Sequence, residues 1–211
     1  MGKASRRKGV VKGPARGRPG GTAFAVAVVV ILAIGVGLIA LARNDSNASA
    51  GGERPGLQDH WHAAYVVDIC GTNEPKMPEP PKLLGLHTHN DGLIHVEPYV
   101  TGSVLDRGRN ATLARFVEGE PGFKLTSNEV QVPGGHPMRN GDKCDGRDPG
   151  QVTIRVWPDV SREVYKDYTN PKDVKIIDNS AITVAFVPPG TPIGKPPSIA
   201  NLANPNAGEG G

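Results

Sequence analysis

Residues 60–70 read HWHAAYVVDIC and residues 86–97 read LHTHNDGLIHVE, and these two stretches decide the fold that we expect. In the first, every second residue from Trp61 to Ile69 is apolar or aromatic, which is typical of a strand with one buried face. The second lies within residues 83–99, which we interpret as a hairpin with its turn at Asn90-Asp91-Gly92.

The rest of the pattern predicts short strands and little helix. Further strands are expected at residues 122–125, 130–132, 151–157 and 181–187. One helix is expected over residues 110–118, where Asn110 is a plausible N-cap and Gly119 ends the apolar stripe. The expected fold class is therefore α+β: mainly antiparallel β-sheet or a small barrel with one short helix, preceded by a single transmembrane helix.

Five of the six histidines lie on the two deciding stretches: His60, His62, His87, His89 and His95. Side chains two residues apart on a strand share a face, at a spacing of roughly 6.5–7 Å. A three-residue turn with Gly92 in the left-handed conformation would place His87 opposite His95. A two-residue turn would pair Thr88 with His95 and break the cluster. We expect the three-residue turn, and pairing of the first strand beside this hairpin would then bring four or five imidazoles together.

A histidine cluster of this kind indicates a transition-metal site. Neutral imidazole is the commonest protein ligand for such metals, and a nitrogen ligand set without Met or Cys fits Zn(II), Cu(II), Ni(II) or Fe(II), of which we expect Zn(II) or Cu(II). Asp59, Asp91 and Glu97 are near enough in sequence to orient the imidazoles. Taken alone, Glu97 is more typical of a carboxylate on the solvent-exposed face of a strand. His136 lies in a loop rich in Gly and Pro, and we expect it to be exposed and not to bind metal. The competing interpretation is that all five histidines are ordinary polar strand residues.

Residues 22–42 are 21 residues without a charge, which as a helix would span roughly 30 Å, the thickness of a bilayer's hydrocarbon core. Seven basic and no acidic residues precede this segment, which predicts a cytoplasmic N-terminus and an extracytoplasmic C-terminal domain. The alternative is a cleaved secretory signal, because Ala40-Leu41-Ala42 has the A-x-A form. On either interpretation the remainder of the chain is exported.

The domain organisation follows from this segment. We expect a cytoplasmic disordered basic tail (residues 1–21), the transmembrane helix (22–42), a flexible linker (43–56), the exported globular domain (57–199) and a disordered tail (200–211). From residue 43 onward the chain has 17 Lys and Arg against 21 Asp and Glu, which argues against nucleic acid as a partner. The lipid bilayer is the expected partner, through residues 22–42, and nothing indicates a protein partner.

Cys70 and Cys144 are the only cysteines. Outside the membrane, where disulfides form and persist, we expect them to pair; two free thiols are the alternative.

Three runs carry a resemblance to a known family. They are His60-Trp61-His62-Ala63-Ala64-Tyr65, Gly85-Leu86-His87-Thr88-His89 followed by Asp91-Gly92 and His95, and Gly108-Arg109-Asn110-Ala111-Thr112-Leu113. Together with Val184 to Pro188 they make the chain similar to an uncharacterised family of actinobacterial single-pass membrane proteins with an exported domain and H-W-H and H-T-H motifs. The resemblance covers nearly the whole exported domain and supports its compartment, but it implies no chemistry.

The leading hypothesis is a membrane-anchored extracytoplasmic domain that binds a transition metal through its histidine cluster. Binding, sensing or handling is favoured over catalysis, because no convincing acid, base or nucleophile accompanies the histidines. No G-x-S-x-G, H-E-x-x-H or P-loop motif is found either. One alternative is a metal-free envelope interaction or accessory module. Another is a cupin-like or hydrolytic metalloenzyme with Glu97 as base, although a cupin would carry a glutamate where Leu93 or Ile94 stands.

Overall fold

The computed structural model describes residues 9, 13, 25–36, 54–144, 146 and 148–208. The chain divides into two compact units, residues 1–50 and 51–211. In the first unit residues 25–36 form a helix. Among the described residues, no helix combines the length and the apolar character that crossing a membrane requires.

Much of the predicted N-terminal organisation lies outside these residues. Of the predicted span, residues 22–24 and 37–42 are not described. The same holds for nearly all of the predicted basic tail and for linker residues 43–53. The transmembrane segment therefore stays a prediction.

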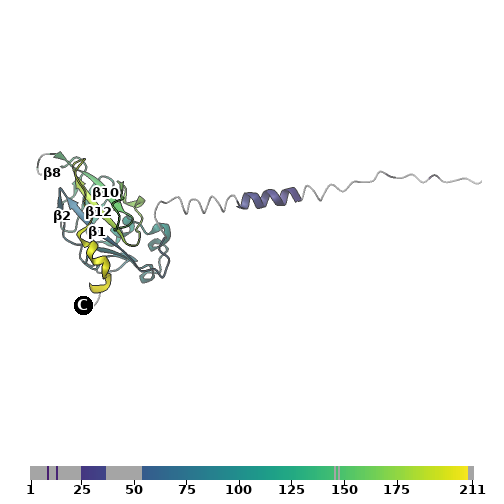
Figure 1. Cartoon of the computed structure of the whole chain (residues 1–211), viewed down its shortest axis with the longest axis horizontal. Coiled ribbons are helices and arrows are strands. Elements are labelled where there is room, and N and C mark those ends of the chain that lie inside the picture. Colours follow the sequence, from purple (N-terminus) through teal and green to yellow (C-terminus); the bar gives the residue numbers. More distant parts are fainter. Residues whose placement is uncertain are drawn as a thin grey trace, which may run out of the picture. The chain divides into compact units, whose positions relative to one another are not determined.

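The second unit is built on a seven-stranded sheet with the order β11-β10-β12-β1-β4-β3, and β2 pairs with β1 at one end. Figure 1 shows β1, β12 and β10 side by side. The strands are β1 (Trp61–Ile69), β2 (Thr72–Asn73), β3 (Leu86–His87), β4 (Leu93–Val96), β10 (Gln151–Trp157), β11 (Lys166–Tyr168) and β12 (Ser180–Val187).

Smaller elements surround this sheet. Two minor sheets contain β5 (Lys124–Leu125), β6 (Glu129–Gln131), β7 (Met138–Arg139), β8 (Lys143–Cys144) and β9 (Asp148–Pro149). The helical elements are α2 (Leu113–Gly119) and the short 3-10 turns η1 (Pro98–Val100), η2 (Val104–Asp106), η3 (Gly108–Asn110), η4 (Pro171–Asp173), η5 (Pro197–Ala203) and η6 (Pro205–Gly208).

The α+β class with mainly antiparallel sheets and little helix is confirmed, with two refinements. The main sheet is open among the described strands, because β11 and β3 lie at its opposite ends, so the barrel alternative is wrong. In addition, β1 and β12 pair in parallel at the centre of the sheet. Parallel neighbours need a long crossover connection, and here more than a hundred residues separate the two strands.

The predicted helix begins later than expected. Its N-cap is Thr112, whose side chain accepts a hydrogen bond from Arg115 N at 3.2 Å, and the helix ends at Gly119. Asn110 lies in η3 instead, and its amide donates to Val104 O at 2.8 Å. Thr112 takes the capping role because its extended backbone places its hydroxyl within reach of the third helical N–H.

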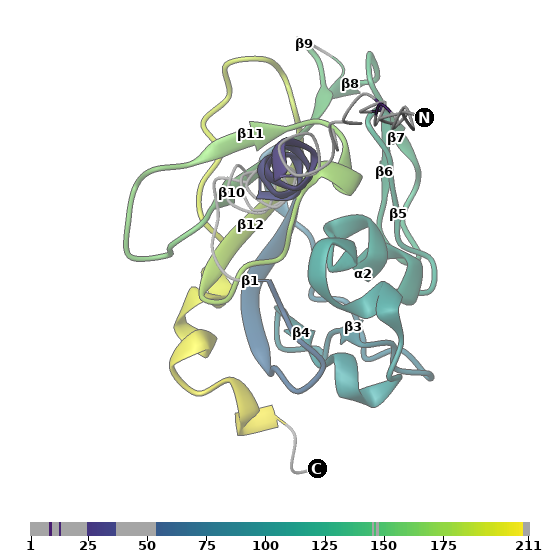
Figure 2. The same ribbon diagram turned by 90° about the vertical axis from the view of Figure 1, so that its right-hand side faces the viewer.

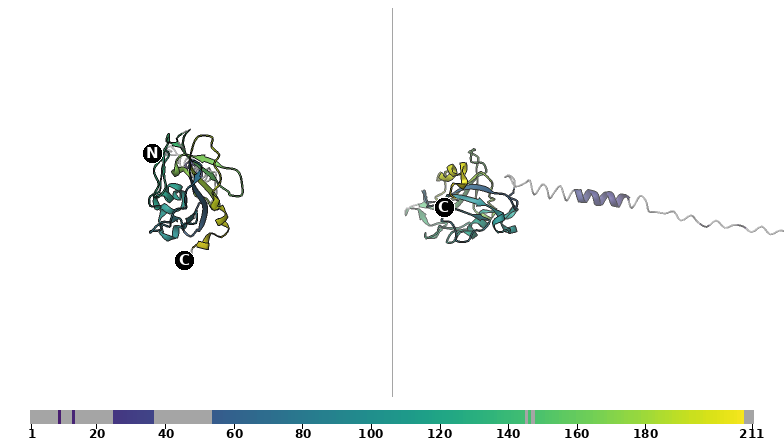
Figure 3. Two further views of the ribbon diagram at one scale, coloured as in Figure 1. Left: turned by 90° about the vertical axis from the view of Figure 1, so that its left-hand side faces the viewer. Right: turned by 90° about the horizontal axis from the view of Figure 1, so that it is seen from below.

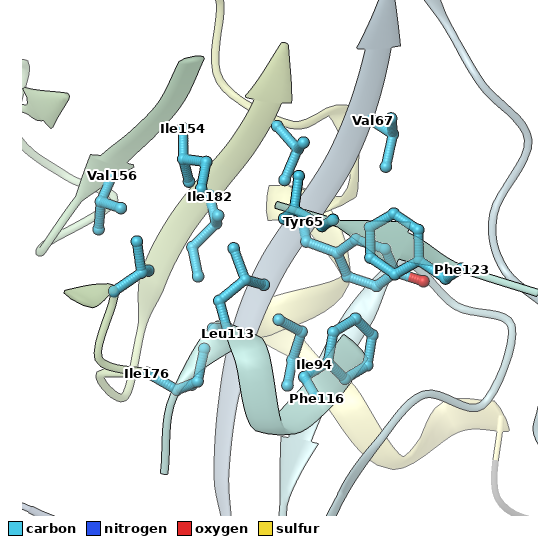
Figure 4. Close-up of a cluster of buried hydrophobic side chains, with 14 of the residues drawn as sticks. Tyr65, Val67, Ile94, Leu113, Phe116, Phe123, Ile154, Val156, Ile176 and Ile182 are labelled. Atoms are coloured by element: carbon cyan, nitrogen blue, oxygen red, sulfur yellow. The ribbon is translucent and has the colours of Figure 1, made fainter. Parts of the chain in front are cut away.

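One face of the sheet carries the main hydrophobic core. Figure 4 shows Leu113 and Phe116 of α2 directed toward Ile94 and Tyr65 of the sheet. The Tyr65 and Phe116 rings meet edge to face with their centroids 5.2 Å apart. Burying each large apolar side chain of this kind stabilises the fold by about 1.5–3 kcal/mol, which fixes the odd-numbered face of β1 toward α2.

The opposite face of β1 is covered by the C-terminal segment. Figure 2 shows α2 and this yellow segment on opposite sides of β1, and both views of Figure 3 place it at the surface of the unit. Ser198 of η5 donates from its hydroxyl to Tyr65 O at 3.2 Å, and Asn201 donates from its amide to Asp91 O at 2.7 Å. A disordered tail is expected over residues 200–211, but residues 200–208 include the end of η5 and all of η6.

The predicted disulfide between Cys70 and Cys144 is confirmed. It links the chain just after β1 to β8 across 74 residues of sequence. In the chain-entropy model a crosslink of this loop length stabilises the fold by about 4 kcal/mol. It also ties the two-stranded β8–β9 sheet to the end of β1 that lies away from His60 and His62.

Candidate metal centre

Three histidines form a row across neighbouring strands. His62 on β1 lies directly opposite His95 on β4, and His95 lies directly opposite His87 on β3. The row occupies the face of the sheet that points away from α2, because Ala63, Ile94 and Leu86 alternate with it and belong to the core. The pairing of His87 with His95, expected from a three-residue turn, is confirmed.

The turn has the backbone conformation that this register requires. Gly92 has φ +80° and Asn90 has φ +60°. The Asp91 carboxylate closes the turn by accepting a hydrogen bond from Leu93 N at 2.9 Å. An alanine Cβ at Gly92 would come within 2.8 Å of the Ser198 Cβ, so η5 packs directly against the turn.

Three residues next to this row of histidines, His60, Glu97 and His89, extend the cluster. Continuing the β1–β4 register places His60 opposite Glu97, and His60 Nε2 lies 2.7 Å from Glu97 Oε1. On the other side of β4, Glu97 N donates to Gly85 O at 2.7 Å. His89 lies just beyond β3, with its ring centroid 4.6 Å from that of His95. The structure thus brings together all five histidines that the sequence singled out.

His60, His62 and His95 could hold a metal ion. Each offers one ligand atom, and these atoms all lie within 4.8 Å of one another. The ring centroids of His60 and His95 lie 4.6 and 4.7 Å from that of His62. His62 Nε2 is buried and has no hydrogen-bond partner among the described residues, which would cost about 1–3 kcal/mol if no ion bound there.

His87 and His89 form a second, adjoining pair. Their Nε2 atoms are 3.0 Å apart, and their ring centroids are 4.7 Å apart. His87 Nδ1 donates to Leu84 O at 2.8 Å, and His89 Nδ1 donates to Glu79 Oε2 at 3.1 Å. His87 is fully buried, whereas the His89 side chain is 14% exposed.

Carboxylates surround the imidazoles. Glu97 is only 7% exposed and not the solvated strand residue that its position suggested; its Oε2 lies 3.9 Å from His87 Nε2. His95 Nε2 donates to Asp91 Oδ2 at 2.8 Å, as expected of a carboxylate that orients a ligand. Asp59 does not have this role, because its carboxylate accepts from Gly56 N at 2.6 Å in the preceding turn.

The electrostatic environment keeps the cluster suited to cations. Burial, followed by the nearby His95 and His60 rings, lowers the pKa of His62 to about 4. Burial also lowers the pKa of His87. For Asp91, burial alone would raise the pKa, but the hydrogen bonds from His95 and Leu93 outweigh it and the pKa is lowered. At neutral pH His62 and His87 are therefore uncharged, which is the form that binds metal.

A chain of hydroxyl groups connects the cluster to the core. Tyr65 Oη donates to Thr88 Oγ1 at 3.5 Å, and Thr88 Oγ1 donates to Asp91 Oδ1 at 3.4 Å. Glu120 lies beside Thr88 and is 3% exposed, with one carboxyl oxygen that has no partner among the described residues. Burial raises the pKa of Glu120 to about 8, so that this carboxyl group is protonated at neutral pH.

A buried ion pair positions the β3 side of the site. Arg115 Nε of α2 lies 2.6 Å from Oδ1 of the fully buried Asp106. The other carboxylate oxygen of Asp106 accepts from Gly85 N at 3.2 Å and from the Thr101 hydroxyl. A Cβ at Gly85 would clash with Asp106 at 2.5 Å, so glycine is needed where the chain enters β3.

Sequence reasoning missed two groups that contact the histidines. Glu79 comes from the Pro-rich loop between β2 and β3, and Asp178 Oδ1 accepts from His62 N at 3.0 Å, 116 residues away in sequence. Neither has a local signal, because both reach the cluster only through the fold. His136 is exposed in its loop between β6 and β7 and takes no part, as expected.

Comparison with known proteins adds no identification. No protein-family model, curated protein or solved structure matches this chain. The resemblance to an actinobacterial exported-domain family therefore stays a prediction.

Proposed function

We propose that this protein is a membrane-anchored extracytoplasmic domain that binds a transition metal ion through His60, His62 and His95. The observation that carries the proposal is that one ligand atom of each of these three histidines lies within 4.8 Å of the others. Buried polar groups in folded proteins are normally satisfied, and an ion would satisfy His62 Nε2.

The ligand set supports Zn(II) or Cu(II) as the ion. All three ligands are imidazole nitrogens, and the disulfide-bonded cysteines are not available as thiolates. Three histidines leave a fourth position of a tetrahedral ion open to water or to a transferred ligand. We favour metal binding and handling over catalysis for this position, because the two carboxylates beside the three histidines are both engaged, Glu97 by His60 and Asp91 by His95.

The compartment rests on two separate observations. Residues 22–42 are uncharged and follow seven basic residues, which supports an anchor with a cytoplasmic N-terminus. The Cys70–Cys144 disulfide supports an oxidising compartment for the domain.

The proposal is tested by metal analysis of the full chain after loading with Zn(II) and dialysis. The wild type is expected to retain zinc, and His62→Gln is expected to bind zinc at least about tenfold more weakly. Loss of a residue that only hydrogen-bonds to a metal ligand already lowers metal affinity about 10–100-fold, and loss of the ligand itself should cost no less. His136→Gln, which changes an exposed histidine outside the cluster, is the matched control. A wild type that retains no zinc or copper would overturn the proposal and favour a metal-free interaction module.

A further inference from the structure

We infer that the cluster holds two metal ions, the second bound by His87 and His89 with Glu97 between the two sites. This inference rests on the proposed function, because it takes the three-histidine site as the first of the pair. It concerns the same class of ligand, a divalent transition-metal ion that prefers nitrogen.

The hydrogen bonds of His87 and His89 fix where their lone pairs lie. Leu84 O can only accept, so His87 Nδ1 must carry the proton that makes this bond. The Glu79 carboxylate likewise accepts from His89 Nδ1. When both imidazoles are neutral, the other nitrogen of each ring is the acceptor, and both Nε2 atoms then offer lone pairs to one ion.

These two lone pairs meet at short range. The Nε2 atoms lie 3.0 Å apart and share a hydrogen bond when one of them carries a proton, and a metal ion that binds both nitrogens takes the place of that proton. Ligand atoms about 2.0–2.1 Å from a tetrahedral zinc ion are roughly 3.3 Å apart, so the two rings need to move little to share one ion. A metal-binding histidine usually donates its other ring N–H to a backbone carbonyl or a carboxylate, which fixes the orientation of the ring. His87 makes this bond to Leu84 O, and His89 makes it to Glu79.

Glu97 connects this pair to the three-histidine site. One of its oxygens lies 2.7 Å from His60 Nε2 and the other 3.9 Å from His87 Nε2. It is therefore the carboxylate that faces both groups, and its burial removes it from competing water. His95 lies between the groups, with its ring centroid 4.7 Å from that of His62 and 4.6 Å from that of His89.

Zinc stoichiometry of the intact full chain, measured by native mass spectrometry in detergent, tests the inference. We expect two zinc ions in the wild type, one in His89→Gln, one in His60→Gln and two in the control His136→Gln. His89 and His60 are chosen because their side chains are 14% and 32% exposed, so both variants are expected to fold, which near-UV circular dichroism checks.

The other outcomes separate this inference from the proposed function. One zinc ion in the wild type, whether kept or lost in His89→Gln, would overturn the second site and leave metal binding intact. Two ions that persist in His89→Gln would place the second ion elsewhere and also overturn it. No zinc in the wild type would overturn the proposed function, and the two-ion inference with it.

Discussion

His62 and His95 lie directly opposite each other on β1 and β4, with ring centroids 4.7 Å apart and ring planes perpendicular. Side chains at directly opposed positions of an antiparallel pair are the closest neighbours that a sheet offers. His60 lies two residues before His62, and Glu97 lies two residues after His95. Because side chains two residues apart on a strand share a face, this one pairing brings all four groups onto the same face of the sheet. The pairing of β1 with β4 is therefore the structural basis of the proposed site.

Asp91→Asn is expected to weaken zinc binding by about 10–100-fold, because the Asp91 carboxylate orients His95 through a 2.8 Å hydrogen bond. Zinc affinity measured by competition with a chelating dye checks this. Asp148→Asn, on the exposed β9, is the matched control and should bind as the wild type does. Equal affinities of the two variants would show that Asp91 does not act on the metal.

Zinc is expected to leave the protein as the pH falls from about 6.5 toward 4, because imidazole must be neutral to bind metal. In the metal-free protein the pKa of His62 is lowered from 6.5 to about 4. The unfolded chain therefore takes up a proton before the folded chain does, and stability falls as the pH drops from 6.5 to 4. Zinc content after equilibration at stepwise lower pH measures the first effect. Unchanged retention at pH 4 would contradict histidine ligation.

The wild type is expected to lose stability at alkaline pH as Glu120 ionises, and Glu120→Gln is expected to lose less. Burial raises the pKa of Glu120 from 4.5 to about 8, so its contribution is fully present below pH 4.5 and is lost as the pH rises through 8. Urea unfolding of the metal-free protein at pH 7.5 and 9, above the range in which His62 titrates, should show a decline in the wild type that is smaller in the variant. The same decline in both proteins would mean that Glu120 does not carry this proton.

Gly92→Ala is expected to destabilise the fold more than Gly102→Ala. Both glycines have positive φ, at +80° and +67°, and left-handed backbone costs other residues about 1–2 kcal/mol. Only at Gly92 would the new Cβ also meet Ser198, at 2.8 Å, which adds an overpacking cost of about 1–3 kcal/mol. Urea unfolding of the two variants measures the difference. Equal stabilities would show that η5 yields at this contact.

The local part of the site could be predicted from sequence. The H-x-H spacing puts His60 with His62, and His87 with His89, on common faces because strands have a period of two. The turn at Gly92 then fixes the register, since a shift by one residue would send every side chain to the other face. The metal-site hypothesis combined these two rules with the preference of transition metals for imidazole and with the expected pairing of the first strand beside the hairpin.

What sequence could not predict depends on contacts between distant segments. The burial of Glu97 results from its place between His60 and the chain at Gly85, which no local pattern reveals. Glu79 and Asp178 reach the histidines from loops whose paths are set by the whole fold. The parallel pairing of β1 with β12 likewise joins two strands that lie near opposite ends of the domain's sequence.

The three-histidine metal site is tested most directly by a crystal structure of the zinc-loaded protein, with diffraction recorded on both sides of the zinc absorption edge. We predict an anomalous peak about 2.0–2.1 Å from a ring nitrogen of each of His60, His62 and His95. An ordered cluster without such a peak, or a peak bound by other residues, would contradict the central claim.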